Sequence, residues 1–186
     1  MKYLTLLLFF ISFYSFGQSE MPDMPIKEGK ITYIYIDTLS GTNKEKLHNT
    51  LLQWIAKNAN NSNHVIKLND KEEGKILGKI SFNAPVVVNK HKFIYNYDFN
   101  AEFTVKEDRY RVIFTDFTIN IQGNSATIEQ LLESIKVIEN NPKNKSGQIM
   151  FDINKQSLVN IDNYSRKLLQ VLAADVETAV TKNNDF

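Results

Sequence analysis

Between Phe93 and Val105, apolar and polar side chains alternate along the chain for thirteen residues. Every even position except Ile94 is polar, and the odd positions are apolar: Phe93, Tyr95, Tyr97, Phe99, Ala101, Phe103 and Val105. Because successive side chains of a strand point to opposite faces, this pattern predicts a long strand with one face on a core and the other on water. A half-buried strand of this kind is typical of an antiparallel sheet.

The segments on either side of this strand predict a meander. Residues Asn89–Lys92 are the expected hairpin connection before it, and Arg109–Ile121 is the expected partner strand after it. In the partner strand the apolar residues fall at even positions up to Phe114 and at odd positions from Phe117 onwards. This change of phase predicts a β-bulge near Thr115–Asp116, which would curve the sheet.

Apolar alternation also predicts three shorter strands. They cover Lys30–Ile36, His64–Leu68 and Lys75–Phe82. The first carries apolar side chains at both odd and even positions, so we expect it to be buried on part of both faces. Pro85 is expected to interrupt the third before Val86–Val88, because proline cannot donate to a strand ladder.

Helical spacing of apolar residues predicts three helices. They cover Thr42–Ala59, Thr127–Ile138 and about Asn154–Thr181, with a loop over Asn140–Gly147. Two capping boxes are expected, Thr42 with Glu45 and Thr127 with Gln130, because each pair can satisfy free backbone donors at a helix start.

Helices that are segregated from the strands indicate the α+β class. The expected fold is a curved antiparallel sheet of about five strands, in the order β-α-β-β-β-β-α, with the helices packed on one face and a long C-terminal helix. A single domain is expected over residues 30–181. A linker over residues 18–29, kept extended by Pro22 and Pro25, would precede it, and a disordered tail over residues 182–186 would follow.

Residues 1–17 have the layout of a secretory signal peptide. Lys2 precedes an apolar run from Leu4 to Tyr14, and Ser15 and Gly17 place small residues where a signal peptidase cuts. The run is shorter than the ~18 residues that a spanning helix needs. We therefore expect cleavage, export to the periplasm or cell surface, and no membrane span afterwards. An uncleaved membrane anchor is the alternative.

Composition excludes several kinds of chemistry. The chain contains no cysteine, which excludes disulfides, thiol chemistry, zinc–thiolate sites and iron–sulfur clusters. Without Lys2, basic and acidic residues are equal in number at 21 each. A neutral chain lacks the basic excess that nucleic-acid binding needs, so no nucleic-acid partner is expected.

The segment Asn69–Phe82, NDKEEGKILGKISF, places two Gly-Lys pairs after an acidic cluster. Only three residues separate Gly74 from Gly78, and the lysine after the second glycine is followed by isoleucine, so the spacing of a phosphate loop is absent. A calcium loop beginning at the same asparagine would need oxygen ligands where Lys71 and Ile80 stand. We expect a hairpin with a solvated acidic tip and a positive φ at Gly74.

No catalytic constellation is apparent, and neither an enzymatic activity nor a cofactor or metal is expected. The chain has no Gly-x-Ser-x-Gly elbow, and its histidines form no His-x₃-His pair: they are His48, His64 and His91. Two carboxylates could meet through folding, as in glycosidases. The candidates Asp98, Glu102 and Asp116 are more simply explained as a solvated strand face.

Four stretches carry a resemblance to a known family: LLQWIAKNA (Leu51–Ala59), the glycine-containing stretch after the acidic turn (Gly74–Lys79), YNYDFNAEF and YRVIFTDF. In these motifs the chain resembles a family of exported bacterial domains of unknown function that have a TATA-binding-protein-like fold. The resemblance covers roughly Lys30–Val180. It implies a fold and an export route but no activity, and it implies that the Thr127–Ile138 helix is an insertion.

One row of aromatic residues could be either core or a ligand-binding face. The row consists of Tyr95, Tyr97, Phe99, Phe103, Tyr110 and Phe114. Burial beneath the helices is the default for alternating aromatics. The leading functional hypothesis is a non-catalytic exported module that binds an unknown protein or cell-envelope component. The alternative is a carrier that holds an apolar ligand between this row and the C-terminal helix. The oligomeric state is not predicted.

Overall fold

The computed structural model of the protein describes residues 21–58, 65–121, 123–140 and 145–182. The predicted signal peptide, His64 and residues 183–186 of the predicted tail lie outside these ranges. The strands are β1 (Ile26–Lys27), β2 (Lys30–Ile31), β3 (Tyr33–Thr38), β4 (Val65–Asp70), β5 (Lys75–Val88), β6 (His91–Lys106), β7 (Arg109–Ile121) and β8 (Asn124–Thr127). The helices are α2 (Lys44–Asn58), α3 (Ile128–Glu139) and α4 (Lys145–Lys182).

Six of these strands form one antiparallel sheet. Its order is β3-β7-β6-β5-β4, and β8 pairs with β7. The predicted α+β class and antiparallel sheet are confirmed, whereas β8 was not predicted. The small ribbon of β1 and β2 lies partly within the predicted linker, where Met24 is also buried in the core.

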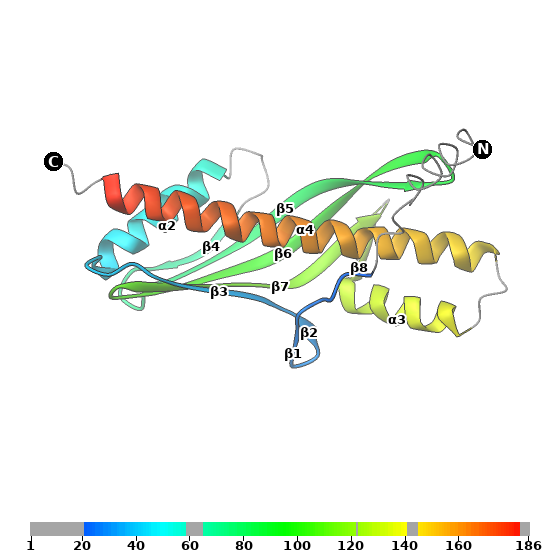
Figure 1. The fold of residues 1–186 in the computed structure, drawn as a ribbon, viewed down its shortest axis with the longest axis horizontal. Helices are drawn as coiled ribbons and strands as arrows, with labels where there is room; N and C mark the ends of the chain where they lie inside the picture. Colours follow the sequence, from blue (N-terminus) through cyan, green and yellow to red (C-terminus); the bar gives the residue numbers. More distant parts are fainter. Residues whose placement is uncertain (1–20, 59–64, 122, 141–144, 183–186) are drawn as a thin grey trace, which may run out of the picture.

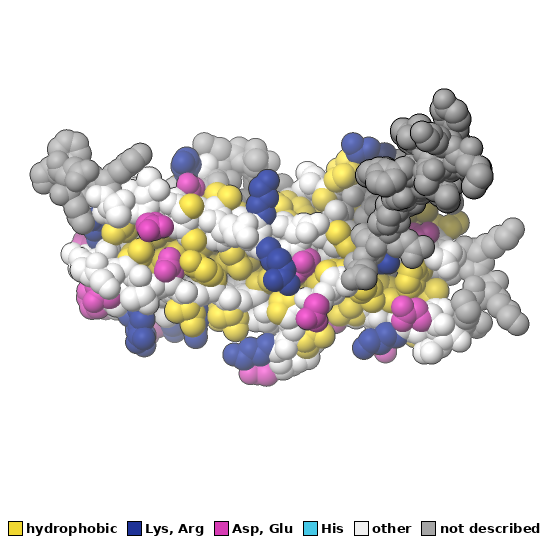
Figure 2. Space-filling view, viewed as in Figure 1, with side chains coloured by type: hydrophobic (Ala, Val, Ile, Leu, Met, Phe, Trp, Pro, Cys, Tyr) yellow, Lys and Arg dark blue, Asp and Glu magenta, His cyan; other side chains and the backbone are white. Residues whose placement is uncertain are grey.

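The helices lie together over the sheet, with α4 along its length and α2 and α3 near its opposite ends (Figure 1). Apolar residues of all three helices share one core with the odd-numbered residues of β6 from Tyr97 to Val105. On the helix-bearing side shown in Figure 2, acidic and basic side chains are scattered among apolar ones and form no large patch of one sign. The even-numbered side chains of β6 point to the other side of the sheet, which we call the open face.

The predicted alternation in β6 is confirmed over most of its length. The odd residues from Tyr97 to Val105 are at most 1% exposed. Phe93 differs, since it lies at the hairpin end of the strand and is 43% exposed. The prediction for the first strand was wrong on one face: Ile34 and Ile36 are 43% and 62% exposed, because no helix covers the open face.

The predicted β-bulge in β7 is confirmed. Asp98 pairs with Thr118 and Asn100 with Thr115, so two residues of β7 lie opposite the single residue Phe99. The first of the two, Asp116, has a φ of 55°. The extra residue shifts the alternation by one position, which keeps the apolar residues on both sides of the bulge facing the core.

The predicted interruption at Pro85 is wrong, because β5 runs without a break to Val88. Pro85 pairs with Ile94 of β6, and β4 pairs with β5 only from Lys75 to Lys79. Beyond Lys79 the other side of β5 is an edge with which no described strand pairs, and Asn160 Nδ2 of α4 donates to Pro85 O there at 2.9 Å. Proline is tolerated on such an edge, where no ladder hydrogen bond is lost.

The predicted capping box at the start of α2 is also wrong. Asn43 caps the helix instead, since its Oδ1 accepts from the backbone N–H of Lys46 at 2.8 Å. The backbone N–H of Thr42 donates to Asp108 Oδ1 at 3.0 Å, which fixes the chain to the β6–β7 turn before the helix begins. The box of Thr127 and Gln130 at the start of α3 is confirmed.

Helix α4 starts earlier than predicted. It begins at Lys145, so the predicted loop over residues 140–147 overlaps its first turn. The apolar stripe that identified the helix is incomplete there: Ile149 and Met150 are 40% and 48% exposed. The periodicity of buried apolar residues therefore did not reveal this first part of α4, which does not pack against the core.

The β4–β5 turn has the predicted positive φ at Gly74, which is 70°. Glu72 and Glu73 at its tip are exposed, as predicted, and the turn also contacts neighbouring elements. Gly74 O accepts from the N–H of Val105 at 2.7 Å, and Lys71 Nζ lies 2.6 Å from Glu45 Oε1 of α2. A Cβ at Gly74 would lie 2.4 Å from Val105 O, so glycine is needed for close packing as well as for its φ.

Candidate binding surface

The predicted aromatic row lies on the covered face of the sheet. Tyr97, Phe99, Phe103, Tyr110 and Phe114 are at most 1% exposed, and Tyr95 is half-buried. The ring of Phe99 is 4.9 Å from that of Phe114 and 5.0 Å from that of Phe117, measured between centroids. These rings therefore pack against one another beneath the helices.

The buried hydroxyl groups of this row have partners inside the protein. Tyr97 Oη donates to Ser157 Oγ on α4 at 3.2 Å, and Tyr110 Oη donates to Asp37 Oδ2 at 3.3 Å. Burial is the main cause that raises the pKa of both tyrosines. Both hydroxyls therefore stay protonated and are poor bases. The bond of Tyr97 joins β6 to α4, and the bond of Tyr110 joins β7 to β3.

On the open face, residues paired across the strands form rows. One row is mainly aliphatic and crosses the sheet through Ile34, Ile113, Glu102, Leu77 and Leu68. The next row contains Ile36, Arg111, Thr104, Lys75 and Asp70, and a third contains Thr38, Arg109 and Lys106. Aliphatic and basic side chains thus adjoin at the β6–β7 end of the sheet.

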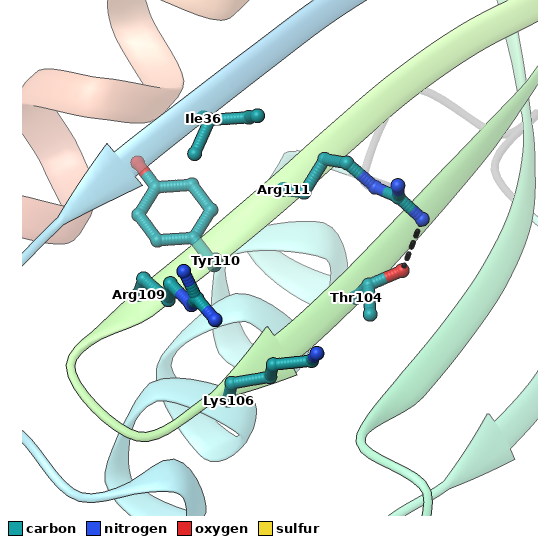
Figure 3. A pocket seen from close by; sticks show the side chains of 6 residues that line it. All are labelled: Ile36, Thr104, Lys106, Arg109, Tyr110 and Arg111. Atoms are coloured by element: carbon teal, nitrogen blue, oxygen red, sulfur yellow. Dashed lines mark hydrogen bonds between the residues drawn. The ribbon is translucent and has the colours of Figure 1, made fainter.

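These rows enclose a shallow pocket of about 240 Å³, which we call the cationic pocket. It is lined by Ile36, Thr104, Lys106, Arg109, Tyr110 and Arg111. In Figure 3 these side chains come from β3, β6 and β7, and the helices lie behind the sheet. Its volume is below the ~300–1,000 Å³ of drug-sized ligand sites. It therefore suits a single side chain or small anionic group.

The acidic residues of the β6–β7 turn face away from this pocket. Glu107 Oε2 accepts from the backbone N–H of Lys44 at 3.1 Å, at the start of α2. Asp108 accepts from Thr42 in the same region. The free N–H groups and positive end of a helix dipole favour carboxylates at this position. Lys106 and Arg109, which flank the turn, lie on the side of the pocket.

The basic groups of the pocket are only partly neutralised. Arg111 lies 3.6 Å from Glu102 Oε1 and donates to Thr104 Oγ1 at 3.3 Å (Figure 3). A half-exposed ion pair at this distance is weak. Within the described residues, Lys106 and Arg109 have no ion-pair partner. The pocket therefore carries a net positive charge beside the exposed side chain of Ile36.

The part of the open face around Asn96 and Asp98 is polar. Asn120 Nδ2 donates to Asn96 Oδ1 at 3.1 Å and to Asp98 Oδ2 at 3.0 Å, while Asn96 Nδ2 donates to Asn83 Oδ1 at 3.2 Å. Lys79 Nζ lies 2.9 Å from Asp98. These groups satisfy one another, so this end of the face has fewer free charges than the cationic pocket.

The candidate carboxylates do not resemble a catalytic acid and base. Burial alone would raise the pKa of Asp98, but hydrogen bonds from Ser81 and Lys79 outweigh it and lower the pKa. The hydrogen bond from Lys30 is the main cause that lowers the pKa of Asp116. A general acid needs a raised pKa, so both groups are better suited to structural ion pairs.

The two described histidines differ in solvent exposure. His48 is buried on α2, and His91 is exposed at the start of β6. Neither ring nitrogen of His48 has a hydrogen-bond partner of normal geometry, although a backbone group of Lys75 lies near enough to favour the charged ring slightly. Among the described residues, no three histidine, aspartate or glutamate side chains are grouped to hold a metal ion.

The cationic pocket was not predicted from the sequence. Lys106 and Arg109 stand in the motif KEDR, whose alternating charges look neutral. The acidic side chains are drawn away from the basic ones by the contacts of Glu107 and Asp108 with the start of α2. In the described part of the chain, no helix combines the length and hydrophobicity that a membrane crossing requires.

Comparison with known proteins agrees with the fold. Residues 36–120 match the model of a family described as a domain of unknown function (DUF4468) with TBP-like fold. No curated protein matches the chain. A crystal structure of a DUF4468 family protein from Bacteroides ovatus is similar, with a TM-score of 0.58 and 13% identity over 84% of this chain and 89% of that one.

A TBP-like protein from Parabacteroides distasonis is similar as well. Its TM-score is 0.54 and its identity 16%, over 83% of this chain and 97% of that one. Identities this low show a shared fold and carry no information on activity. The predicted resemblance to a bacterial domain of unknown function with a TATA-binding-protein-like fold is confirmed.

Proposed function

The chain contains a domain of the DUF4468 family, which has a TBP-like fold and no known activity, and we propose that it is a non-catalytic module that binds an acidic partner. The binding surface is the open face of the sheet at the cationic pocket. The partner is an acidic protein segment or another anionic component of the cell envelope.

The observation that carries this proposal is the separation of charge at the β6–β7 turn. Lys106 and Arg109 face the pocket without an ion-pair partner among the described residues, while Glu107 and Asp108 are bound to the start of α2. Ile36, 62% exposed, supplies apolar area beside them. A protein surface that combines aliphatic area with unpaired cations matches an acidic, partly apolar partner.

The proposed location rests on the N-terminal sequence. The layout of residues 1–17 supports export, so the partner would be met outside the cytoplasm. To test this, the full chain would be expressed in a bacterial host, fractionated, and measured by intact mass. Loss of residues 1–17 from an exported product is expected. A full-length product in the cytoplasm would contradict export without affecting the binding proposal.

The binding proposal can be tested with short poly-L-glutamate and poly-L-lysine peptides. We expect poly-glutamate to shift the amide NMR signals around Arg109 and Arg111, and its affinity to fall as salt is added. Poly-lysine should not bind. A response spread evenly over the molecule, or equal binding of both peptides, would contradict the proposal.

A matched pair of double variants gives the control. Lys106→Glu with Arg109→Glu should abolish poly-glutamate binding. Lys92→Glu with Lys167→Glu makes the same change in net charge at exposed positions on β6 and α4 outside the pocket, and it should retain most of the binding. Equal loss in both variants would show that only net charge matters, and the pocket would not be the site.

The alternative function, a carrier of an apolar ligand, has no observation in its favour among the described residues. Phe99 packs against Phe114, and Tyr97 bonds to Ser157 of α4, so these rings lie against protein. Tyr110 lines the cationic pocket, which is smaller than a drug-sized ligand site. We therefore develop only the binding proposal.

A further inference from the structure

Strand β3 is an unprotected edge of the sheet. Its sequence, YIYIDT, contains no proline, glycine or lysine. The opposite edge differs: β4 has a register shift around Lys67, and the part of β5 beyond β4 contains Pro85 and accepts a hydrogen bond from Asn160 of α4. Bulges, lysine and proline are devices by which proteins prevent the addition of further strands. Among the described strands, only β3 combines a regular edge with exposed aliphatic side chains and none of these devices.

The direction of the backbone groups in β3 follows from the hydrogen bonds at its end. Leu39 N–H donates to Asp108 O at 2.6 Å, on the side of β7. Because groups alternate along a strand, the odd residues of β3 point to β7 and the even residues point outward. The N–H and C=O groups of Ile34 and Ile36 therefore face the free edge.

Both ends of this edge are already occupied. Thr32 N–H donates to Pro25 O at 2.8 Å, and Thr38 N–H donates to Asp37 Oδ1 at 2.8 Å. Within the part of the chain that the structure describes, the backbone groups of Ile34 and Ile36 are left for a partner. Their side chains lie on the open face, and Ile36 is paired with Arg111 and lines the cationic pocket.

We propose that the acidic partner binds as an extended peptide segment that adds a strand to β3. This inference rests on the proposed function and deepens it. Adjacent strands lie ~4.8 Å apart, so a strand beside β3 is about two strand spacings from Arg109 and Arg111. On the open face, the side chains of Ile36 and Thr38 on β3 lie between the added strand and these arginines. An arginine side chain is long enough to extend past them to a carboxylate of the added strand. The backbone supplies affinity and the carboxylates supply specificity.

A second copy of the chain fits this edge less well. Its own β3 would present Ile34, Ile36 and Thr38 on the open face, with no carboxylate to meet Arg109 and Arg111. Charge complementarity therefore favours an acidic segment of another protein.

The test uses three peptides of alternating residues and the full chain. The first alternates glutamate and valine. The second has lysine in place of glutamate. The third keeps glutamate and valine but carries N-methyl groups on alternate backbone nitrogens, which blocks strand hydrogen bonds and leaves the side chains. We expect the first peptide to bind and the other two to bind at least about tenfold more weakly, since two or more hydrogen bonds or the charge attraction are lost.

The outcomes separate the two proposals. If the N-methylated peptide binds as well as the unmodified one, strand addition is overturned while the cationic pocket remains a binding site. If the lysine peptide binds as well as the glutamate peptide, the charge argument of both proposals fails. Concentration-dependent dimerisation that the peptide does not compete with would assign the edge to a second copy and overturn the inference.

Variants at one position distinguish the backbone from the side chain. Ile36→Ala keeps the outward N–H, whereas Ile36→Pro removes it at an edge where proline is compatible with the sheet. Ile36→Pro should weaken peptide binding about tenfold beyond Ile36→Ala. Equal affinities would overturn strand addition.

Amide exchange in the unaltered protein keeps the inference testable if the proline variant does not fold. The amides of Ile34 and Ile36 should exchange quickly in the free protein and slowly with the glutamate–valine peptide. The amides of Tyr33 and Tyr35, which point to β7, should be protected in both states. Unchanged exchange at Ile34 and Ile36 in the peptide-bound protein would overturn strand addition.

Discussion

The two faces of β6 differ in polarity and burial although alternate residues of one strand form both. On the covered face, side chains from Tyr97 to Val105 are apolar and at most 1% exposed. On the open face, the intervening residues Asn96, Asp98, Asn100, Glu102 and Thr104 are polar and half-buried, and each takes part in a hydrogen bond or ion pair.

This difference separates stability from recognition. Burying apolar area contributes about 25 cal/mol per Å², so the covered face supplies most of the free energy of folding. Polar groups that exchange water for one another contribute little net stability. The open face can therefore vary in chemistry without loss of the fold, and its cationic end is where binding is proposed.

The largest expected effect is on the covered face. Phe99→Ala removes a ring packed against Phe82, Phe114, Phe117 and Tyr164, and should lower the free energy of unfolding by about 4 kcal/mol. Asn100→Ala, one residue further on the open face, should cost less than about 1 kcal/mol. Denaturant unfolding of both variants measures the contrast. Similar costs at the two positions would show that the faces do not divide as described.

The fold was largely predictable because its signals are local. The alternation from Phe93 to Val105 and the phase change at Thr115–Asp116 specify a long strand and a bulged partner, and both are confirmed. Errors arose where a distant contact decides the outcome. The start of α2 depends on Asp108, more than 60 residues along the chain from Thr42. Pro85 was misjudged because its tolerance depends on where β4 ends.

The candidate surface was much less predictable. Ile34 and Ile36 look like core residues in sequence, and only the absence of a helix on the open face exposes them. The basic residues of KEDR look neutralised by their neighbours. The rows of the open face arise from the pairing of β3, β6 and β7, which no single segment encodes. The aromatic row was conspicuous in sequence and serves mainly as core.

A smaller effect is expected from the few polar contacts on the covered face. Tyr33 Oη donates to Asp162 Oδ1 of α4 at 2.8 Å, and Arg166 donates to the same carboxylate at 2.8 Å. Asp162→Ala would leave the buried Tyr33 hydroxyl without this acceptor and should cost about 2 kcal/mol in unfolding free energy.

A double-mutant cycle identifies the source of that cost. Adding Tyr33→Phe to Asp162→Ala removes the orphaned hydroxyl, so the second change should be nearly neutral in that background. If Tyr33→Phe costs as much with Asp162→Ala as without it, the hydrogen bond is not what stabilises this contact. The contact between Tyr33 and α4 would then be stabilised by packing instead.

The smallest effect is a pH dependence at His48, also on the covered side. Burial is the first cause that lowers its pKa from the ordinary 6.5, and the charges of Lys71 and Lys44 add to it. Below that value the unfolded chain binds a proton that the folded protein does not, so stability should fall between about pH 7 and pH 5. The lowered pKa values of Glu45, Asp98 and Asp116 act further down, because the unfolded groups titrate near 4. In His48→Leu, unfolding measured by denaturant should lose this slope while the decline below pH 5 remains. The same slope in both proteins would mean that His48 does not titrate in this range.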